Sequence, residues 1–300
     1  MHAEPLKGIT RLWCGLWRLS SKARGSAPMP KIWLLPTANS RAQLNVFTLA
    51  DHYGSTEMIH GQCRKTLPSS ANVVGATKWC VLKPSRAVME SPVRERLARM
   101  QTDRVDPYKI STQLGPGVIV SNQVQFSLID TRTLHGMTDV GHRHNVKLLT
   151  YGTLCGGFLP DRWLDQPEPD LYSGDFTPSQ RKYLDMIVKA WGTLTLFQVL
   201  LGRLRTIAGR HEGINIASIT TRWVLDKPCV GAVLIGARLG LSDHLDDKME
   251  VFQPTCCLTD EDNRAIEDIL QYSNGRKIIT TIGDSGAEPG RSIGSRLGNG

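Results

Sequence analysis

Two short segments, LADHYG at 49–54 and GATKW at 75–79, carry residue types that are suited to proton transfer. Each follows a β-branched or apolar run, at 46–47 and 73–74, that predicts a buried strand. Tyr53 and Lys78 then lie at the carboxyl ends of two strands, the edge at which parallel α/β barrels carry out chemistry. An ammonium beside a phenol lowers the pKa of the phenol, which makes it a better proton donor. The pair therefore predicts a general acid with a cationic partner.

Longer motifs follow after residue 117: VIVSNQVQFSL (118–128), VKLLTYGTLCGGFL (146–159), GAVLIGAR (231–238) and SNGRKIITTIGD (273–284). Together with the tyrosine and lysine segments, they resemble the aldo-keto reductases, particularly fungal members found in secondary-metabolite and toxin pathways. The likeness runs from Val118 to about Gly286, and LWCGLWRLSS at 12–21 is similar to the family's first strand. It implies an α/β fold, a (β/α)8 barrel, and reduction of an aldehyde or ketone to an alcohol with NADPH.

The resemblance also implies a role for individual residues. Tyr53 is expected to protonate the carbonyl oxygen, and Lys78 to support it electrostatically. Gln123 is expected to hold the nicotinamide carboxamide, and the ring of Tyr151 to stack on the nicotinamide. Without the resemblance, each has an ordinary alternative: a rim aromatic, a solvated lysine, a partnered core glutamine and a barrel aromatic.

The remaining NADP(H) contacts are expected from two loops. Glycines that follow Tyr151 let the backbone approach a pyrophosphate closely, because they have no Cβ. The resemblance places the adenosine end near the last barrel strand, where an arginine fork suits a 2′-phosphate; an exposed helix surface is the alternative there. The predicted cofactor contacts are Gly152, Thr153, Leu154, Cys155, Gly156, Gly157, Gly236, Ala237, Arg238, His244 and Asp247.

Several departures from the family pattern bear on activity. The family has an aspartate five residues before the tyrosine, where it anchors the lysine, and here that residue is Thr48. The chain also passes from Asp106 to Thr112 within a few residues, which predicts the loss of an active-site histidine, a helix and most of barrel strands 4 and 5. The segment 32–45 does not match the family's first helix. We therefore expect an incomplete barrel.

Three interpretations follow from this sequence. The first is an NADPH-dependent reductase that acts on a small-molecule carbonyl substrate. The second is a catalytically impaired remnant that binds a dinucleotide or a partner. The third is a non-functional gene product, because a barrel that lacks strands exposes hydrogen-bonding edges.

Composition limits the other classes of function. The 300 residues, 40% hydrophobic, suit one domain at 1–283, and the Gly- and Ser-rich segment 284–300 is expected to be a disordered tail. The net charge of +8 suits an anionic dinucleotide, and no nucleic-acid-binding signature accompanies it.

Seven cysteines without CxxC spacing favour neither a disulfide framework nor a zinc site. No apolar run has membrane-spanning length, so we expect a cytoplasmic protein.

Helix signals are clearest in the second half. Thr177 and Gln180 form a capping-box pattern, and glycines at 192, 202 and 209 predict two or three helices that end near Asp226. The apolar segment 230–235 predicts the last barrel strand. Ser242 predicts the start of a helix after it, and Thr259 with Asp262 predicts the start of a further helix. An earlier helix is predicted from Ser91. His142 and His144 point apart on a helix and predict no metal site.

Overall fold

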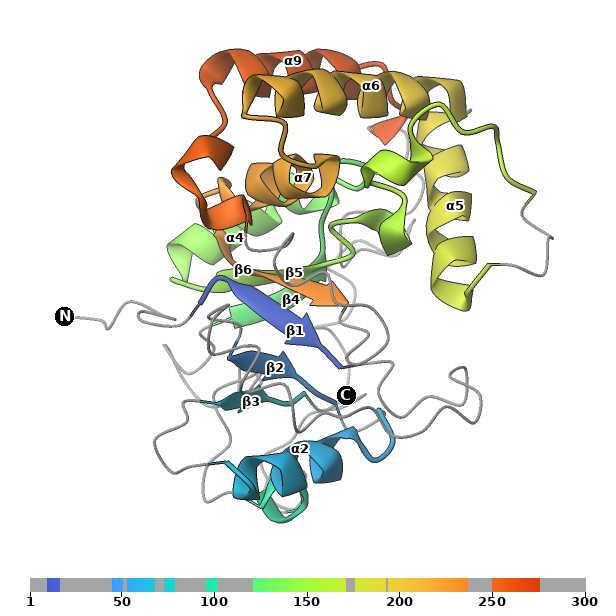
Figure 1. Cartoon of the computed structure of the whole chain (residues 1–300). Helices are drawn as coiled ribbons and strands as arrows, with labels where there is room; N and C mark the ends of the chain where they lie inside the picture. Colours follow the sequence, from blue (N-terminus) through green and yellow to red (C-terminus); the bar gives the residue numbers. More distant parts are fainter. Residues whose placement is uncertain are drawn as a thin grey trace, which may run out of the picture. The chain divides into compact units, whose positions relative to one another are not determined.

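A computed structural model describes residues 10–16, 45–50, 53–67, 73–78, 95, 97–101, 121–170, 176–192, 194–236 and 250–275 (Figure 1). Contacts divide the chain into two compact units. The first comprises Met1–Gln123, Gly141–Leu149 and Cys229–Asp246, and the second Val124–Val140, Thr150–Pro228 and Asp247–Gly300.

The first unit is built on a six-stranded sheet with the order β3-β2-β1-β6-β5-β4, in which the final residues of β4 and β5 belong to the second unit. The pairs β1–β2, β1–β6 and β2–β3 are parallel. The strands predicted near residue 12, at 46–47, at 73–74 and at 230–235 are confirmed. The six strands are β1 Leu12–Gly15, β2 Val46–Thr48, β3 Val74–Ala76, β4 Ser121–Gln125, β5 Lys147–Tyr151 and β6 Val230–Gly236.

The register of this sheet brings the carboxyl ends of neighbouring strands to one edge. Cys14 of β1 lies opposite Phe47 of β2, and Phe47 lies opposite Gly75 of β3. The next residues out are Thr48 and Ala76, which pair with each other as well. The loops that carry Tyr53 and Lys78 therefore leave adjacent strands at the same edge. The strand side chains form the core of this unit, in which Leu12, Cys14, Val46, Leu149 and Val233 are fully buried.

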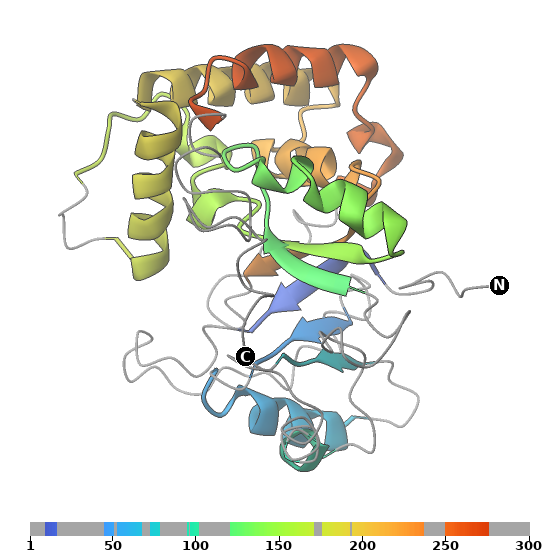
Figure 2. The same cartoon turned by 180° about the vertical axis from the view of Figure 1, so that it is seen from behind.

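Helix α2 (Thr56–Lys65) packs beside β3 (Figures 1 and 2). His60 of α2 is buried against Gly75, where a side chain larger than hydrogen would meet the imidazole ring. Leu97 and Met100, which follow the predicted helix start at Ser91, are helical, and Met100 is buried. The predicted start of that helix at Ser91 lies outside the described residues.

The second unit is helical. Its core contains Phe126, whose ring lies 5.7 Å from that of Trp223, together with Phe197 and Leu204. Short 3-10 turns connect its longer elements. The helices and turns are η4 Arg132–Leu134, α4 Met137–Arg143, η5 Cys155–Gly157, η6 Asp161–Trp163, α5 Pro178–Trp191, α6 Leu194–Arg210, α7 Ile216–Leu225, η7 Glu250–Phe252, η8 Pro254–Cys256 and α9 Asp260–Leu270; the end of α4 is counted in the first unit.

Capping residues set the ends of these helices as the sequence predicts. Thr177 and Gln180 form a capping box at α5, and Gly192 ends that helix with a φ of 79°, a conformation that favours glycine. Gly202 and Gly209 lie inside α6 and do not interrupt it. Three helices therefore lie between Pro178 and Asp226, within the predicted number.

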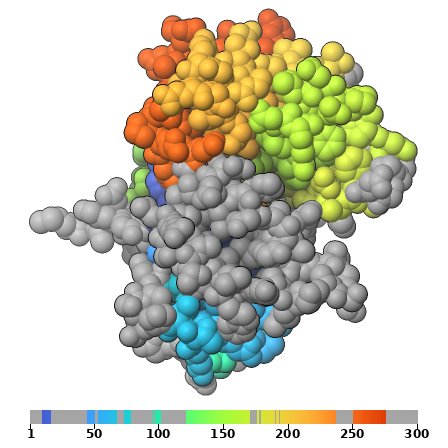
Figure 3. Space-filling view, in the orientation of Figure 1, coloured from blue at the N-terminus to red at the C-terminus, as the bar shows by residue number. Residues whose placement is uncertain are grey.

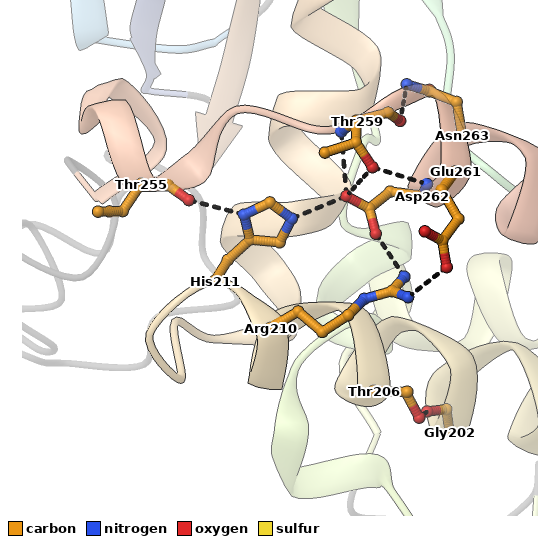
Figure 4. Close-up of polar contacts among 9 residues, drawn as sticks. All are labelled: Gly202, Thr206, Arg210, His211, Thr255, Thr259, Glu261, Asp262 and Asn263. Atoms are coloured by element: carbon orange, nitrogen blue, oxygen red, sulfur yellow. Dashed lines mark hydrogen bonds and ion pairs between the residues drawn. The ribbon is translucent and has the colours of Figure 1, made fainter.

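A buried carboxylate ties α9 to the end of α6 (Figure 4). Asp262 forms the predicted capping box with Thr259, and it also accepts hydrogen bonds from Arg210 at 2.5 Å and from His211 at 2.8 Å. His211 reaches the Thr255 carbonyl oxygen with its other ring nitrogen, at 2.8 Å. The helices α6 and α9 are in contact, and Figure 3 shows their atoms next to each other at the top of the view.

Several predictions fall outside the described residues: the helix at Ser242, the deletion after Asp106 and the tail at 284–300. The parallel α/β sheet agrees with the predicted fold class. It has six strands among the described residues, whereas a complete barrel has eight.

Among the described residues, no single helix is long and apolar enough to cross a membrane. The bent pair Ser179–Lys189 and Leu194–Arg210 reaches the required length and apolar composition only when its two helices are taken together. The single-domain organisation stays a prediction.

Candidate active site

Tyr53 lies in the tight turn that joins β2 to α2. Its backbone N–H donates to the Ala50 carbonyl at 3.1 Å, just past the end of β2. Its own carbonyl accepts from the Thr56 hydroxyl at 2.6 Å, at the first residue of α2. The turn is therefore fixed at both ends, and the Tyr53 side chain is half-buried.

Lys78 follows β3 by two residues, and its ammonium lies over the Tyr53 ring, 4.7 Å from the ring centroid. The loop after β2 and the end of β3 are held together by a 2.8 Å hydrogen bond from the Leu49 N–H to the Ala76 carbonyl. The two predicted catalytic residues are thus brought together within the first unit. A cation in this position favours the phenolate and makes the phenol a stronger acid.

Glu57 is a residue of this region that the sequence analysis missed. It lies in the first turn of α2 and is fully buried. Its carboxylate accepts hydrogen bonds from the Thr77 hydroxyl at 2.5 Å and from Arg99 at 2.7 Å. An acidic residue four positions after Tyr53, at a helix start, was the signal available in the sequence.

Gln123 lies in β4 and is half-buried, and its contact with the nicotinamide stays a prediction. Gly236 ends β6, where it pairs with Gly15 of β1, and the space beside its Cα is open. Four predicted adenosine contacts lie outside the described residues: Ala237, Arg238, His244 and Asp247.

Tyr151, at the end of β5, belongs to the second unit and lies among charged groups. Burial raises the pKa of its phenol, the carboxylate of Asp130 raises it further, and Arg132 partly opposes this. The ammonium of Lys182 lies 5.9 Å from the centroid of its ring and 5.3 Å from that of Tyr183. The residue is half-buried, and its stacking on the nicotinamide stays a prediction.

The loop 152–157 takes left-handed backbone conformations at several positions, with φ of 75° at Gly152, 66° at Gly156 and 94° at Gly157. The missing Cβ atoms of Gly152 and Gly156 make room for the Tyr183 ring from α5. Packing is therefore one physical reason for glycine at these positions. A pyrophosphate contact at the loop stays a prediction.

The side chains of the loop hold its shape and are not reactive. Thr153 donates to the Phe126 carbonyl at 3.3 Å, and the Cys155 thiol donates to Ser127 at 3.4 Å. Burial raises the pKa of Cys155 to about 12, so it remains a thiol at neutral pH. Leu154, the residue between them, is half-buried.

Three backbone N–H groups of this loop are left without an acceptor among the described residues. Within the described part of the chain, those of Thr153, Leu154 and Gly156 donate to no protein acceptor. The exposed guanidinium of Arg162, which the sequence analysis also missed, donates to the Gly157 carbonyl at 3.2 Å. Unpaired N–H groups and a nearby cation are the donors that a phosphate needs.

Residue types that can bind metals or form disulfides are also present among the described residues. Those residues contain no group of three His, Cys, Asp or Glu side chains that could hold a metal ion, and His142 and His144 are both exposed. Six cysteines are free thiols, at 14, 63, 155, 229, 256 and 257. Cys80 lies outside the described ranges.

Comparison with known proteins places the chain in a family. Residues 109–271, just over half of the chain, match the aldo/keto reductase family model, and the chain belongs to this family of carbonyl-reducing oxidoreductases. No curated protein matches it.

Solved structures share its fold. A glycerol dehydrogenase from Gluconobacter oxydans matches with a TM-score of 0.63 at 21% identity, over 89% of this chain and 93% of that one. An aldo-keto reductase from Bacillus halodurans matches at 0.57 and 18%, over 87% and 92%. An aldo/keto reductase from Klebsiella pneumoniae, in complex with NADP and acetate, matches at 0.58 and 16%, over 87% and 92%.

Proposed function

We propose that this protein reduces an aldehyde or a ketone to an alcohol, with NADPH as the hydride source. The observation that carries the proposal is the 4.7 Å approach of the Lys78 ammonium to the Tyr53 ring, at the carboxyl ends of neighbouring parallel strands. Bound NADPH would supply the hydride. The protein would supply the proton and hold the carbonyl in place.

In this proposal Tyr53 donates its phenolic proton to the oxygen of the carbonyl group as negative charge develops there. Lys78 stabilises the phenolate that remains, because its ammonium lies over the same ring. Gln123 would bind the carboxamide of the nicotinamide, and Tyr151 would stack on its ring. The N–H groups of the loop 152–157, with Arg162, would bind the pyrophosphate.

The finer parts of the proposal rest on the sequence motifs. We propose a barrel that lacks most of strands 4 and 5, an adenosine end bound by Arg238, His244 and Asp247, and a cytoplasmic location. The resemblance to fungal enzymes is the basis for proposing a pathway of secondary metabolism or toxin formation.

Turnover of a nitrobenzaldehyde, followed by the fall in NADPH absorbance, tests the function. Tyr53→Phe removes the proton donor and should lower kcat by about 10²- to 10⁴-fold, the usual contribution of general-acid catalysis. Tyr272→Phe is the matched control, since Tyr272 is 70% exposed, and it should leave the rate unchanged. Equal rates for the native protein and Tyr53→Phe would exclude Tyr53 as the acid.

A second candidate is a dinucleotide-binding module without turnover. Thr48 favours it, because a neutral, buried hydroxyl stands where the family resemblance implies the aspartate that anchors the lysine. NADPH should then quench the tryptophan fluorescence while nitrobenzaldehyde is not consumed. A measurable turnover that depends on Tyr53 would exclude this candidate.

A further inference from the structure

One buried carboxylate connects the two segments that carry Tyr53 and Lys78. One oxygen of Glu57 accepts from the hydroxyl of Thr77, the neighbour of Lys78, at 2.5 Å. The other accepts from Arg99 Nε at 2.7 Å, and Arg99 Nη2 donates to the carbonyl of Gly54, the neighbour of Tyr53, at 2.6 Å. The chain of contacts therefore runs from one segment to the other.

We infer that Glu57 is a positioning residue that sets the approach of the Lys78 ammonium to the Tyr53 phenol. The inference deepens the proposed reduction and rests on it for the role of the pair. Glu57 acts through Thr77 on one side and through Arg99 on the other. Its two oxygens accept hydrogen bonds from Thr77 and Arg99, so its assigned role is to hold the two segments, not to transfer the proton.

The environment of Glu57 makes such a link stiff. The side chain has 0% exposure, so water does not compete for its oxygens. It lies in the first turn of α2, where the helix N-terminus stabilises negative charge. Hydrogen bonds to a buried charged group are among the stronger ones in proteins, and a shift of either segment would strain them.

The contacts made by Glu57 matter because Thr48 stands where the family resemblance implies an aspartate that anchors the lysine. Thr48 ends β2 and is uncharged, so it offers no counter-charge to hold Lys78. Glu57 holds the lysine segment from α2 instead, through the residue before it. The ammonium is then placed over the phenol by the backbone of β3 and Thr77.

Substitution of Thr77 tests the link without changing any charge. Thr77→Val keeps the shape but loses the hydroxyl, whereas Thr77→Ser keeps the hydroxyl. The first readout is the titration of Tyr53 by NMR in protein carrying ¹³Cζ-tyrosine, without cofactor, assigned with Tyr53→Phe. The second is kcat and KM for nitrobenzaldehyde across pH.

We expect Thr77→Val to move the Tyr53 titration upward by about one pH unit and to lower kcat about tenfold at neutral pH, with KM nearly unchanged. Thr77→Ser should restore the native titration and rate. Arg99→Lys keeps the positive charge of this partly exposed side chain but cannot contact both Glu57 and the Gly54 carbonyl in the same way. It should also shift the Tyr53 titration upward.

Asp262→Asn is the control for loss of stability, because it removes a buried carboxylate that pairs with an arginine in the second unit. It should lower the melting temperature and leave the Tyr53 titration unchanged. A native titration in both Thr77→Val and Arg99→Lys would overturn the inference and leave Glu57 a structural residue. If the native protein does not reduce the aldehyde, the titration still decides on Glu57, and only the proposed function fails.

Discussion

His60 occupies the space directly beside Gly75. A Cβ on Gly75 would lie 2.6 Å from Cε1 of the imidazole and 2.6 Å from Cε of Met100. The methionine end can rotate away, but the histidine ring is buried and its centroid lies 6.0 Å from that of the Phe47 ring. This close approach of α2 to β3 supports the strand that leads to Lys78.

Gly75→Ala should therefore destabilise the protein. The added methyl group forces the His60 ring or the strand to shift, and overpacking of this kind costs about 1–3 kcal/mol. Chemical denaturation would measure the change in the free energy of unfolding.

Gly202→Ala in α6 is the control for this prediction. Nothing lies within 4 Å of a Cβ at Gly202, and alanine is the better helix former by about 0.5–1 kcal/mol. It should stabilise the protein slightly. An unchanged stability for Gly75→Ala would mean that α2 moves away from β3 at little cost.

His60 should make the stability depend on pH in mildly acidic solution. Burial, with a smaller effect from the charge of Arg64, lowers the pKa of its imidazole from 6.5 to about 4. Neither ring nitrogen has a hydrogen-bond partner among the described residues. The buried ring therefore stays neutral where an exposed one would take up a proton.

The sign follows from proton binding. Between pH 6.5 and about 4 the unfolded chain binds a proton at His60 that the folded protein does not, so the free energy of unfolding falls as the pH falls. The loss reaches at most about 3 kcal/mol. His60→Leu should make the free energy of unfolding, measured by denaturation at a series of pH values, less dependent on pH in this window. His142→Gln, at an exposed histidine, should leave that dependence unchanged. If His60→Leu keeps the native dependence on pH, another group causes it.

Local signals in the sequence were sufficient for much of the fold. The capping boxes at Thr177 and Thr259 act within four residues, and the strand at 230–236 is a continuous apolar run, so both are visible without tertiary structure. The proximity of Tyr53 and Lys78 followed from the rule that parallel strands end at one edge.

Contacts between distant segments could not be predicted in this way. The packing of Tyr183 against Gly152 and the bond from Thr77 to Glu57 each depend on how one element docks on another. Glycine at 152 was therefore interpreted through a ligand alone, although a tyrosine of α5 already requires it. A buried glutamate was missed because its partners are 20 and 42 residues away.

Lys78→Met should remove the cationic partner of Tyr53 while keeping most of the side-chain volume. Without the ammonium the phenol is a weaker acid, and we expect kcat to fall about 100-fold with a nearly unchanged Kd for NADPH. Stopped-flow reduction of nitrobenzaldehyde and fluorescence titration would measure the two quantities. Lys189→Met is the control, because Lys189 is exposed and pairs only with its helix neighbour Asp185 among the described contacts. A parallel loss of rate in both variants would argue against a specific role for Lys78.

Asp262→Asn should loosen the second unit. The carboxylate caps α9 through Thr259 and accepts from His211 and Arg210, and an amide cannot satisfy all of these donors (Figure 4). We expect a loss of about 1–3 kcal/mol in the free energy of unfolding, the usual cost of leaving buried donors unpaired. Asp185→Asn, at an exposed pair, should cost less than about 0.5 kcal/mol.

The same carboxylate adds a second acid transition. Burial alone would raise the pKa of Asp262, but the hydrogen bonds from Thr259 and His211 and the charge of Arg210 outweigh it and hold the pKa below 3.8. Its contribution to stability is therefore complete above pH 3.8 and is lost as the pH falls through the lower folded value. This window lies below that of His60, so thermal melts between pH 7 and pH 2 separate the two groups. Asp262→Asn should remove only the lower step, and a native lower step in this variant would show that other carboxylates cause it.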